Sequence, residues 1–190
     1  WRHLEPVEGY YDWTELDKVI RYANAYDLRL DIVWGGSNFC GRLDPRFAPK
    51  WLWDNHSWHV KDAGGECIKL DGHDLPPCHG VDCRNKEVLE KEKRFIADMM
   101  RHLKESDANH RVILFQVENE VNHNNWMGQD KKAVLGYCNE IGGVIKASPY
   151  VVATRINLVF GENDPDVNEL SNIDFHGPDP YTNKIQDIRK

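Results

Sequence analysis

The sequence has no long apolar run, no cluster of basic residues and no repeated or low-complexity segment. No stretch approaches the length of a membrane span, and no basic segment followed by a hydrophobic core marks an export signal. Because the chain begins with tryptophan, we expect that processing or truncation removed earlier residues. The net charge of -7 without a basic cluster argues against nucleic acid or an anionic membrane as a partner, since both require a concentrated positive surface.

Cysteine is scarce, and the five cysteines include no C-x-x-C pair. Three cysteines fall in one loop-like stretch together with two histidines: Cys67, Cys78, Cys83, His73 and His79. That stretch is compatible with a zinc site or with one disulfide. Structural zinc sites have more closely spaced ligand pairs, so the sequence favours a loop disulfide or free thiols.

A chain of 190 residues with 41% hydrophobic content can bury one substantial core, and no Pro-, Gly- or Ser-rich linker divides it. We therefore expect a single domain over residues 1–190. Segments with apolar residues at helical spacing are 14–26, 86–103 and 131–146. Strand-like runs are 28–34, 112–117, 151–156 and 173–175. Thr14 and Asp17 are placed like the N-terminal cap pair of the first helix.

Alternating strands and helices of this kind form right-handed β-α-β units and a parallel sheet. The fold class is therefore α/β, with a doubly wound sheet and a (β/α)8 barrel as the candidate architectures. No Gly-rich phosphate loop follows any strand, which argues against the nucleotide-binding doubly wound sheets. Barrel enzymes instead place polar and aromatic residues after several strands, as this chain does at 34–38, 118–122, 155–157 and 176–181. A barrel is favoured.

The predicted barrel is partial. A complete (β/α)8 TIM barrel takes about 250 residues and eight strands, and this sequence shows about four. The connection over residues 35–85 is too long for an ordinary strand-to-helix loop, and such loops often cover the active-site face of a barrel. It holds several tryptophans, whose flat rings suit the apolar faces of sugars. Anchoring the loop is the alternative role for any one of them.

The segment Arg111–Glu120 carries the strongest chemical signal. Its apolar, β-branched run ends in Glu118, Asn119 and Glu120, as a buried parallel strand does where it opens into an active site. Burial and a neighbouring negative charge favour the protonated form of a carboxyl group, and a protonated Glu120 would serve as a general acid. On spacing alone, a salt-bridged strand end with structural carboxylates is an equal alternative.

Three segments resemble glycoside hydrolase family 35, β-galactosidase-like members of a large clan of retaining (β/α)8 glycosidases. Gln116-Val117-Glu118-Asn119-Glu120 is similar to the fourth-strand motif of that family. Trp1, Glu5-Pro6, Gly9 and Tyr11-Asp12-Trp13 resemble its segment after the second strand, and Pro49-Lys50-Trp51-Leu52 resembles one after the third. Leu4 stands where the family has histidine, and Trp34–Asn38 lacks its galactose-binding glutamate. Family 42 of the same clan is therefore an alternative.

The resemblance implies that Glu120 is the acid/base and that Asn119 contacts the sugar 2-hydroxyl. It also implies a barrel that runs from the end of strand 2 to strand 6. The nucleophile, a glutamate on strand 7, is then expected outside residues 1–190. Further sugar-binding candidates are Trp34, Asn38, Trp53 and Tyr181. For Tyr181 the alternative is a capping residue in a turn.

The implied function is hydrolysis of O-glycosidic bonds in an oligosaccharide or glycoside by retaining double displacement, with no metal or organic cofactor. A non-catalytic carbohydrate-binding relative and a metal-dependent barrel hydrolase are the alternatives. Many glycosidases of this kind are secreted or periplasmic, which favours that location.

We expect residues 1–190 alone to hydrolyse no glycoside, because the retaining mechanism needs both carboxylates. The measurement is the release of nitrophenol from aryl glycosides by the purified chain. Cleavage at a normal rate would refute the expected position of the nucleophile. Metal analysis of the same sample tests the metal-dependent alternative.

Overall fold

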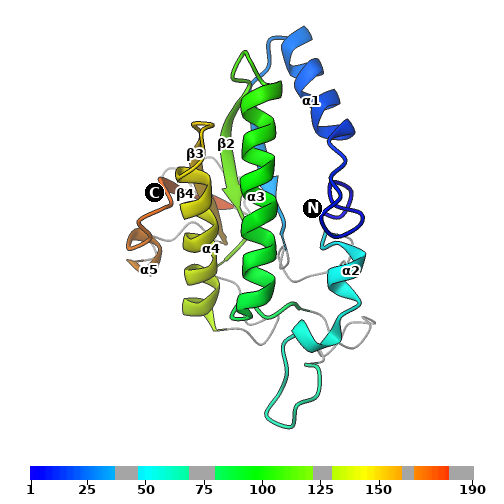
Figure 1. The fold of residues 1–190 in the computed structure, drawn as a ribbon. Helices are drawn as coiled ribbons and strands as arrows, with labels where there is room; N and C mark the ends of the chain where they lie inside the picture. Colours follow the sequence, from blue (N-terminus) through cyan, green and yellow to red (C-terminus); the bar gives the residue numbers. More distant parts are fainter. Residues whose placement is uncertain (37–46, 69–79, 122–129, 160–164, 180–190) are drawn as a thin grey trace.

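The computed structural model describes residues 1–36, 47–68, 80–121, 130–159 and 165–179. Figure 1 shows the elements, which are α1 (Thr14–Ala25), β1 (Leu30–Trp34), α2 (Lys50–Trp53), the 3-10 helix η1 (His56–Trp58), α3 (Lys86–Ser106), β2 (Val112–Val117), α4 (Lys131–Lys146), β3 (Ala153–Val159), α5 (Pro165–Asn168) and β4 (Phe175–Asp179). All helices and strands predicted from the sequence pattern are present. The short elements α2, η1 and α5 are additional.

The strands form one parallel sheet in the order β1-β2-β3-β4. Each strand lies beside its predecessor, whereas a doubly wound sheet reverses its strand order at a switch point. Sequential parallel order is that of a (β/α)8 barrel. The predicted choice of a barrel is confirmed, and the described residues form part of one.

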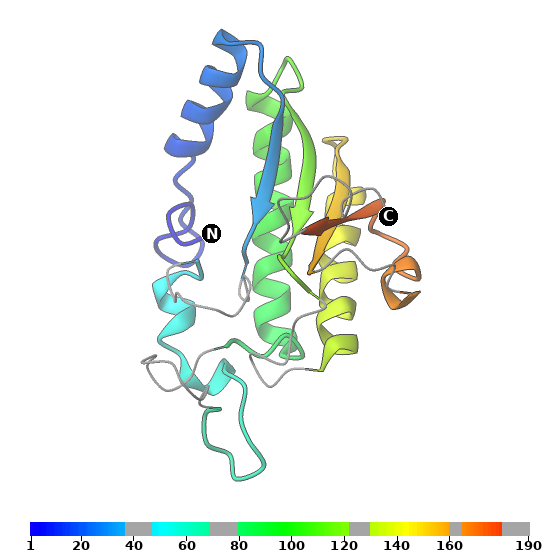
Figure 2. The same ribbon diagram turned by 180° about the vertical axis from the view of Figure 1, so that it is seen from behind.

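The two faces of the sheet have different surroundings. Helices α3 and α4 cover the same face (Figures 1 and 2), and the hydrophobic core lies between them and the strands. The strand register aligns a row of residues on the opposite face: Val33, Gln116, Arg155 and Phe175. In a barrel this second face is the inner one, so Gln116 and Arg155 belong to the barrel interior.

The long connection between β1 and α3 holds α2 and η1. In Figure 2, the arrows of β1 and β2 point toward the end of the molecule at which α2, drawn in cyan, lies. This is the carboxyl end of the strands, where the active sites of barrel enzymes form.

Helix α3 has a capped start and one buried stripe. Asn85 Oδ1 accepts hydrogen bonds from the backbone N–H groups of Glu87 (3.0 Å) and Val88 (3.3 Å), which satisfies donors that a helix leaves unpaired. The buried residues of α3 recur at helical spacing: Val88, Glu92, Phe95, Ile96, Met99, Met100 and Leu103. The predicted apolar stripe is confirmed, but Glu92 within it was not predicted to be buried.

The N-terminal segment is organised around the fully buried carboxylate of Glu5. This carboxylate accepts from Trp1 Nε1 at 2.6 Å and from the Gly9 N–H at 2.7 Å, and it forms an ion pair with Arg94 of α3 at 3.2 Å. Trp51 Nε1 donates to the Glu5 carbonyl oxygen at 3.1 Å. Two of the segments that resemble glycosidase motifs therefore meet here, and Glu5 has a structural role.

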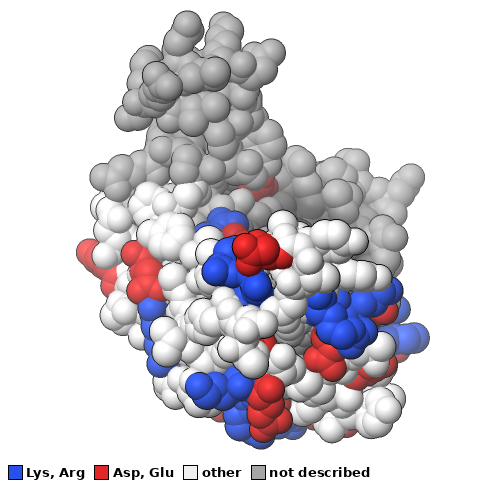
Figure 3. Space-filling view, turned by 90° about the horizontal axis from the view of Figure 1, so that it is seen from above, with Lys and Arg blue, Asp and Glu red and all other residues white. Residues whose placement is uncertain are grey.

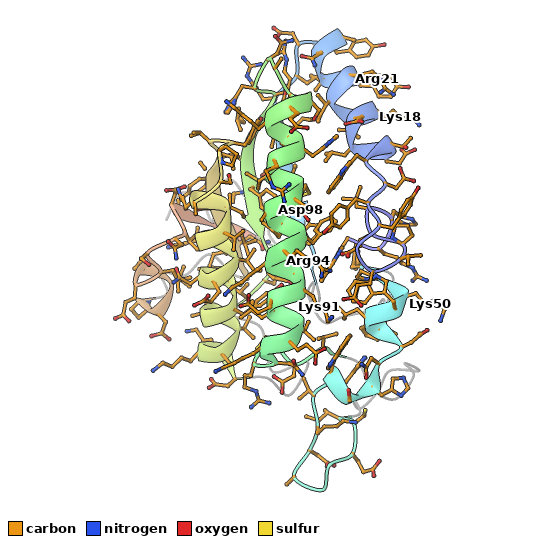
Figure 4. All side chains as sticks on the ribbon, in the orientation of Figure 1. Lys18, Arg21, Lys50, Lys91, Arg94 and Asp98 are labelled. Carbon is orange, nitrogen blue, oxygen red and sulfur yellow. The ribbon has the colours of Figure 1, made fainter. Side chains whose placement is uncertain are left out.

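Polar side chains of α3 also bind this segment (Figure 4, where Lys91, Arg94 and Asp98 are labelled along the helix). Lys91 Nζ lies 2.6 Å from Glu8 Oε1, and Tyr11 OH donates to Asp98 Oδ2 at 2.6 Å. Partly exposed ion pairs contribute little stability. The apolar contacts of the core therefore provide most of the stabilisation.

The start of α1 differs from the predicted cap pair. Asp12 Oδ1 accepts from the Thr14 N–H at 3.0 Å, and the hydrogen bonds from Thr14 lower the pKa of Asp12. Asp17 Oδ1 instead lies 2.6 Å from His102 Nε2 on α3, and Trp13 stacks on the same imidazole with ring centroids 4.8 Å apart. The predicted pairing of Thr14 with Asp17 is wrong because a tertiary partner, His102, engages Asp17.

Basic and acidic side chains are intermixed on the face shown in Figure 3. Charged side chains also pair across elements, as Lys131 of α4 does with Asp166 of α5 at 2.9 Å. None of the helices within the described ranges is long and apolar enough to cross a bilayer.

Phe95 is the centre of the aromatic part of the core, and we expect Phe95→Ala to lower the free energy of unfolding by about 3–5 kcal/mol through the cavity it creates. The ring is fully buried, and four aromatic ring centroids lie 5.3 to 5.6 Å away: Trp34, Tyr11, Trp13 and Trp1. Urea unfolding measures the loss. Val151→Ala at an exposed position is the control, with an expected change below about 0.5 kcal/mol. Equal effects of the two changes would contradict the central position of Phe95.

Candidate active site

The chain turns sharply where β2 ends. Glu118 and Glu120 have left-handed backbone conformations, with φ of 62° and 52°. For a residue other than glycine, this conformation costs about 1–3 kcal/mol and persists only where the surrounding structure enforces it. Strain of this kind at the carboxyl end of a barrel strand is typical of a functional site.

Three hydrogen bonds hold this turn. The Glu118 N–H donates to the Trp34 carbonyl oxygen at 3.0 Å, which continues the pairing of β1 with β2. The Gln116 side chain donates to the Glu118 carbonyl oxygen at 2.9 Å. The Glu120 N–H donates to Asn157 Oδ1 at 2.8 Å. Strands β1, β2 and β3 together therefore fix the backbone that carries the two carboxylates.

Two buried amides, Gln116 and Asn157, form a network on the inner face of the sheet. Gln116 Nε2 lies 3.2 Å from Asn157 Oδ1 and 3.1 Å from Asn119 Oδ1. Because Asn119 Oδ1 accepts from Gln116, the orientation of the Asn119 amide is set. Its Nδ2 group has no hydrogen-bond partner within the part of the chain that the structure describes. An oriented amide donor beside Glu120 suits the binding of a hydroxyl group.

The two carboxylates at the strand end have different surroundings. Glu118 is 2% exposed, and its Oε1 lies 3.5 Å from the hydroxyl of Tyr137 on α4. Its carboxylate is therefore directed into the layer between sheet and helices. Glu120 is 7% exposed and follows Asn119, so it is the better candidate of the two for contact with a ligand.

Glu92 on α3 is a third buried carboxylate, and it was not predicted as a site residue. Its Oε1 accepts from Trp34 Nε1 at 2.8 Å and from Tyr137 OH at 2.5 Å. Burial, and then the charges of Glu92 and Glu118, raise the pKa of Tyr137 well above its usual value, so the phenol stays protonated and donates. The signal in the sequence is a charged residue within an apolar helical stripe.

Asn157 was also not predicted as an individual site residue. It belongs to the segment 155–157, one of the polar segments that the sequence places after strands. Its side chain accepts from both Gln116 and the Glu120 backbone. Polarity alone does not reveal this role, because the acceptor and its donors lie on different strands.

Trp34 is a core residue, which corrects its prediction as a sugar platform. It is 3% exposed, and its indole stacks on Phe95 with ring centroids 5.3 Å apart. The register places Trp34 opposite Val117, on the helix side of the sheet. Its N–H is engaged by Glu92. A sugar ring cannot reach an indole enclosed in this way.

The other predicted sugar contacts have mixed outcomes. Trp53 lies on α2, half-buried, with its ring edge-on to His59 at 4.8 Å, and His59 Nε2 contacts the Trp53 carbonyl oxygen at 2.8 Å. It stays a candidate at the carboxyl end of the strands. Asn38 and Tyr181 lie outside the described residues. His176, the first residue of the polar segment 176–181, is partly buried on β4 opposite Ile156.

The described cysteines do not form a metal centre. Cys67 is disulfide-bonded, and Cys83 and Cys138 are free and buried. Burial and then the charge of Asp82 raise the pKa of Cys83 to about 12, which disfavours the thiolate that binds metals. Among the residues that the structure describes, no group of three or more potential ligands is close enough to hold a metal ion. Cys40 and Cys78 lie outside them.

A sequentially ordered parallel sheet with carboxylates and amides at its strand ends is characteristic of (β/α)8 barrel enzymes. The model of glycoside hydrolase family 42, described as Beta-galactosidase, matches residues 1–140. The chain belongs to this family. The resemblance to the retaining glycosidase clan is confirmed, and of the two families that the motifs allow, the family model supports family 42.

Solved structures that are similar to this chain include a xylanase and an endo-glycoceramidase. An endo-1,4-beta-xylanase from Caldicellulosiruptor owensensis is 15% identical in sequence, with a TM-score of 0.41. The match covers 82% of this chain and 39% of the xylanase chain. Endo-glycoceramidase II from Rhodococcus sp., solved as a lactosyl-enzyme intermediate, is 13% identical in sequence, with a TM-score of 0.50. The match covers 94% of this chain and 47% of the endo-glycoceramidase chain. The second likeness supports the barrel fold. The chain spans less than half the length of either structure. A comparison with curated proteins finds no match.

We expect Asn157→Ala to lower the free energy of unfolding by about 1–3 kcal/mol, because it removes the side-chain acceptor of the buried Glu120 N–H and one of the acceptors of Gln116 Nε2. Thermal and urea unfolding measure the loss. Asn109→Ala is the control, since Asn109 is exposed and its Nδ2 donates to the side chain of Asn24 at 2.8 Å; its effect should stay within about 0.5 kcal/mol. If Asn157→Ala changed the free energy of unfolding as little as the control does, the stabilising role of the amide network would be contradicted.

Proposed function

We propose that this chain provides the acid/base half of the active site of a retaining, β-galactosidase-like glycosidase, with Glu120 as the acid/base and Asn119 as the contact to the sugar 2-hydroxyl. The observation that carries the proposal is the strained turn at the carboxyl end of β2, where Asn157 holds the Glu120 backbone and Gln116 orients the Asn119 amide. The family match over residues 1–140 supports the same assignment. The substrate is a glycoside or oligosaccharide.

In this mechanism Glu120 gives its proton to the departing glycosidic oxygen while a second carboxylate attacks the anomeric carbon. The glycosyl-enzyme that results is then hydrolysed by a water molecule, from which the deprotonated Glu120 removes a proton. The second carboxylate is the nucleophile expected outside residues 1–190. The chemistry needs two carboxyl groups about 5–5.5 Å apart and no cofactor.

The hydrogen bonds of the turn explain why Glu120 is suited to this exchange of protons. The acid/base must lie within hydrogen-bond reach of the leaving oxygen in the first step and of water in the second. A backbone fixed by Asn157 and by the pairing with β1 keeps the carboxyl group in one place for both steps. The oriented donor of Asn119 positions the sugar beside it.

The test is Glu120→Gln in the full-length protein. We expect kcat/KM to fall by about 10²–10⁴-fold for glycosides with poor leaving groups, which need protonation, and much less for activated aryl glycosides. Added azide should restore turnover of the activated substrates by Glu120→Ala and yield a glycosyl azide with the anomeric configuration of the substrate.

Glu5→Gln is the matched control, because it removes the charge of another buried carboxylate, which lies in the N-terminal segment. It should change all substrates by the same factor, measured per folded enzyme. If Glu120→Gln lowered kcat/KM equally for substrates with good and with poor leaving groups, the assignment of Glu120 as the acid/base would be wrong.

A further inference from the structure

Behind the strained turn, four side chains from four elements form a closed ring of contacts. Glu92 of α3 accepts from Trp34 of β1 (2.8 Å) and from Tyr137 of α4 (2.5 Å). Tyr137 OH lies 3.5 Å from Glu118 Oε1. The Glu118 N–H donates to the Trp34 carbonyl oxygen at 3.0 Å, which closes the ring. The ring therefore links the ends of β1 and β2 to both covering helices.

All four members of the ring are buried. A carboxylate in such a place has a desolvation penalty of several kcal/mol that its donors only partly offset, and an apolar residue of similar volume is often as stabilising or more so. The neighbours of Glu92 along the stripe, Val88, Phe95 and Ile96, are all apolar. Stability alone would be served by an apolar side chain at position 92.

The end of β1 passes directly over Glu92. A Cβ atom placed on Gly36 would lie 1.7 Å from Glu92 Oε1 and 2.7 Å from Trp34 Nε1. Only glycine fits there while Glu92 keeps its position. The carboxylate therefore packs directly against the backbone where the chain leaves β1 at the carboxyl end of the sheet.

From this geometry we infer that Glu92, together with Tyr137, is a positioning residue for the acid/base Glu120, acting through the ring that fixes Glu118 two residues before it. The inference rests on the proposed function and adds to it residues that do not touch the substrate. Glu118 in its left-handed conformation is contacted from both sides: its N–H donates to the β1 backbone, and its carboxylate lies against the hydroxyl of Tyr137. Loss of one side lets the turn relax and moves Glu120.

A displacement of about 1 Å at a catalytic group can cost about 10²-fold in rate. It acts on proton transfer, so it is largest for substrates whose leaving group needs a proton. A residue that only supports the fold lowers the activity on all substrates in proportion to the folded fraction. Dependence on the leaving group therefore separates positioning from simple stabilisation.

The experiment compares Tyr137→Phe with Tyr150→Phe in the full-length protein. Both tyrosines are 3% exposed, and Tyr150 OH also binds a buried carboxylate, Asp107, at 2.6 Å. Its second acceptor is the carbonyl oxygen of Val112, at the opposite end of β2 from the active site. Each change removes one phenol oxygen. The Tyr137 hydroxyl lies near the carboxyl end of β2, and the Tyr150 hydroxyl lies at the start of the same strand. Thermal midpoints, kcat and KM are measured with good and poor leaving groups.

We expect both variants to have lower thermal midpoints, and only Tyr137→Phe to lower kcat for poor leaving groups, by about 10–100-fold with KM little changed. Glu92→Gln keeps an oxygen acceptor for Trp34 and Tyr137, so it should retain more activity than Glu92→Ala; this pair also decides the question if Tyr137→Phe does not fold. Equal behaviour of the two tyrosine variants, or of Gln and Ala at position 92, would overturn the inference.

The proposed function is judged separately by Glu120→Gln. If Glu120→Gln shows the dependence on leaving group and Tyr137→Phe does not, only the positioning role fails. If Glu120→Gln itself shows no such dependence, the assignment of the acid/base fails, and the positioning role fails with it.

Discussion

The hydrogen bond from the Glu120 backbone to the Asn157 side chain joins the end of β2 to β3. Left-handed backbone is unfavourable for residues such as Glu118 and Glu120, so the turn that presents the carboxylates exists only because neighbouring strands hold it. The register that sets Trp34 beside Val117 and Gln116 beside Arg155 places Asn157 of β3 beside the turn that follows β2. The candidate site depends on that alignment.

The two faces of the sheet carry different kinds of side chain. Its helix side buries aromatic and aliphatic residues around Phe95, and its inner side carries the amides of Gln116 and Asn157. Glu92 and Tyr137 bring polar groups into the helix side, directly behind the strained turn at the end of β2. Polar groups in an otherwise apolar layer are costly, which is why we propose a positioning role for these two.

Local patterns predicted the long helices, the strands and the sequential β/α order, because amphipathic stripes and β-branched runs depend on near neighbours. Trp34 was misassigned because a tryptophan at a strand end looks the same in sequence whichever face it occupies; only pairing with β2 shows that it faces the helices. Glu92 was missed because its donors lie 58 and 45 residues away in the sequence. The Thr14–Asp17 cap failed for the same reason, since His102 is 85 residues from Asp17.

The sequence by itself determined that this is an α/β chain with carboxylates and amides at the end of one strand, and the resemblance of its motifs predicted Glu120 and Asn119 as site residues. Only the tertiary structure distinguished Glu118, directed toward Tyr137, from Glu120, and only it revealed Glu92, Tyr137 and Asn157 as supports. The physical reason is that hydrogen bonds between strands and helices join residues far apart in the chain. Their partners are set by sheet register and helix docking, which no short stretch of sequence contains.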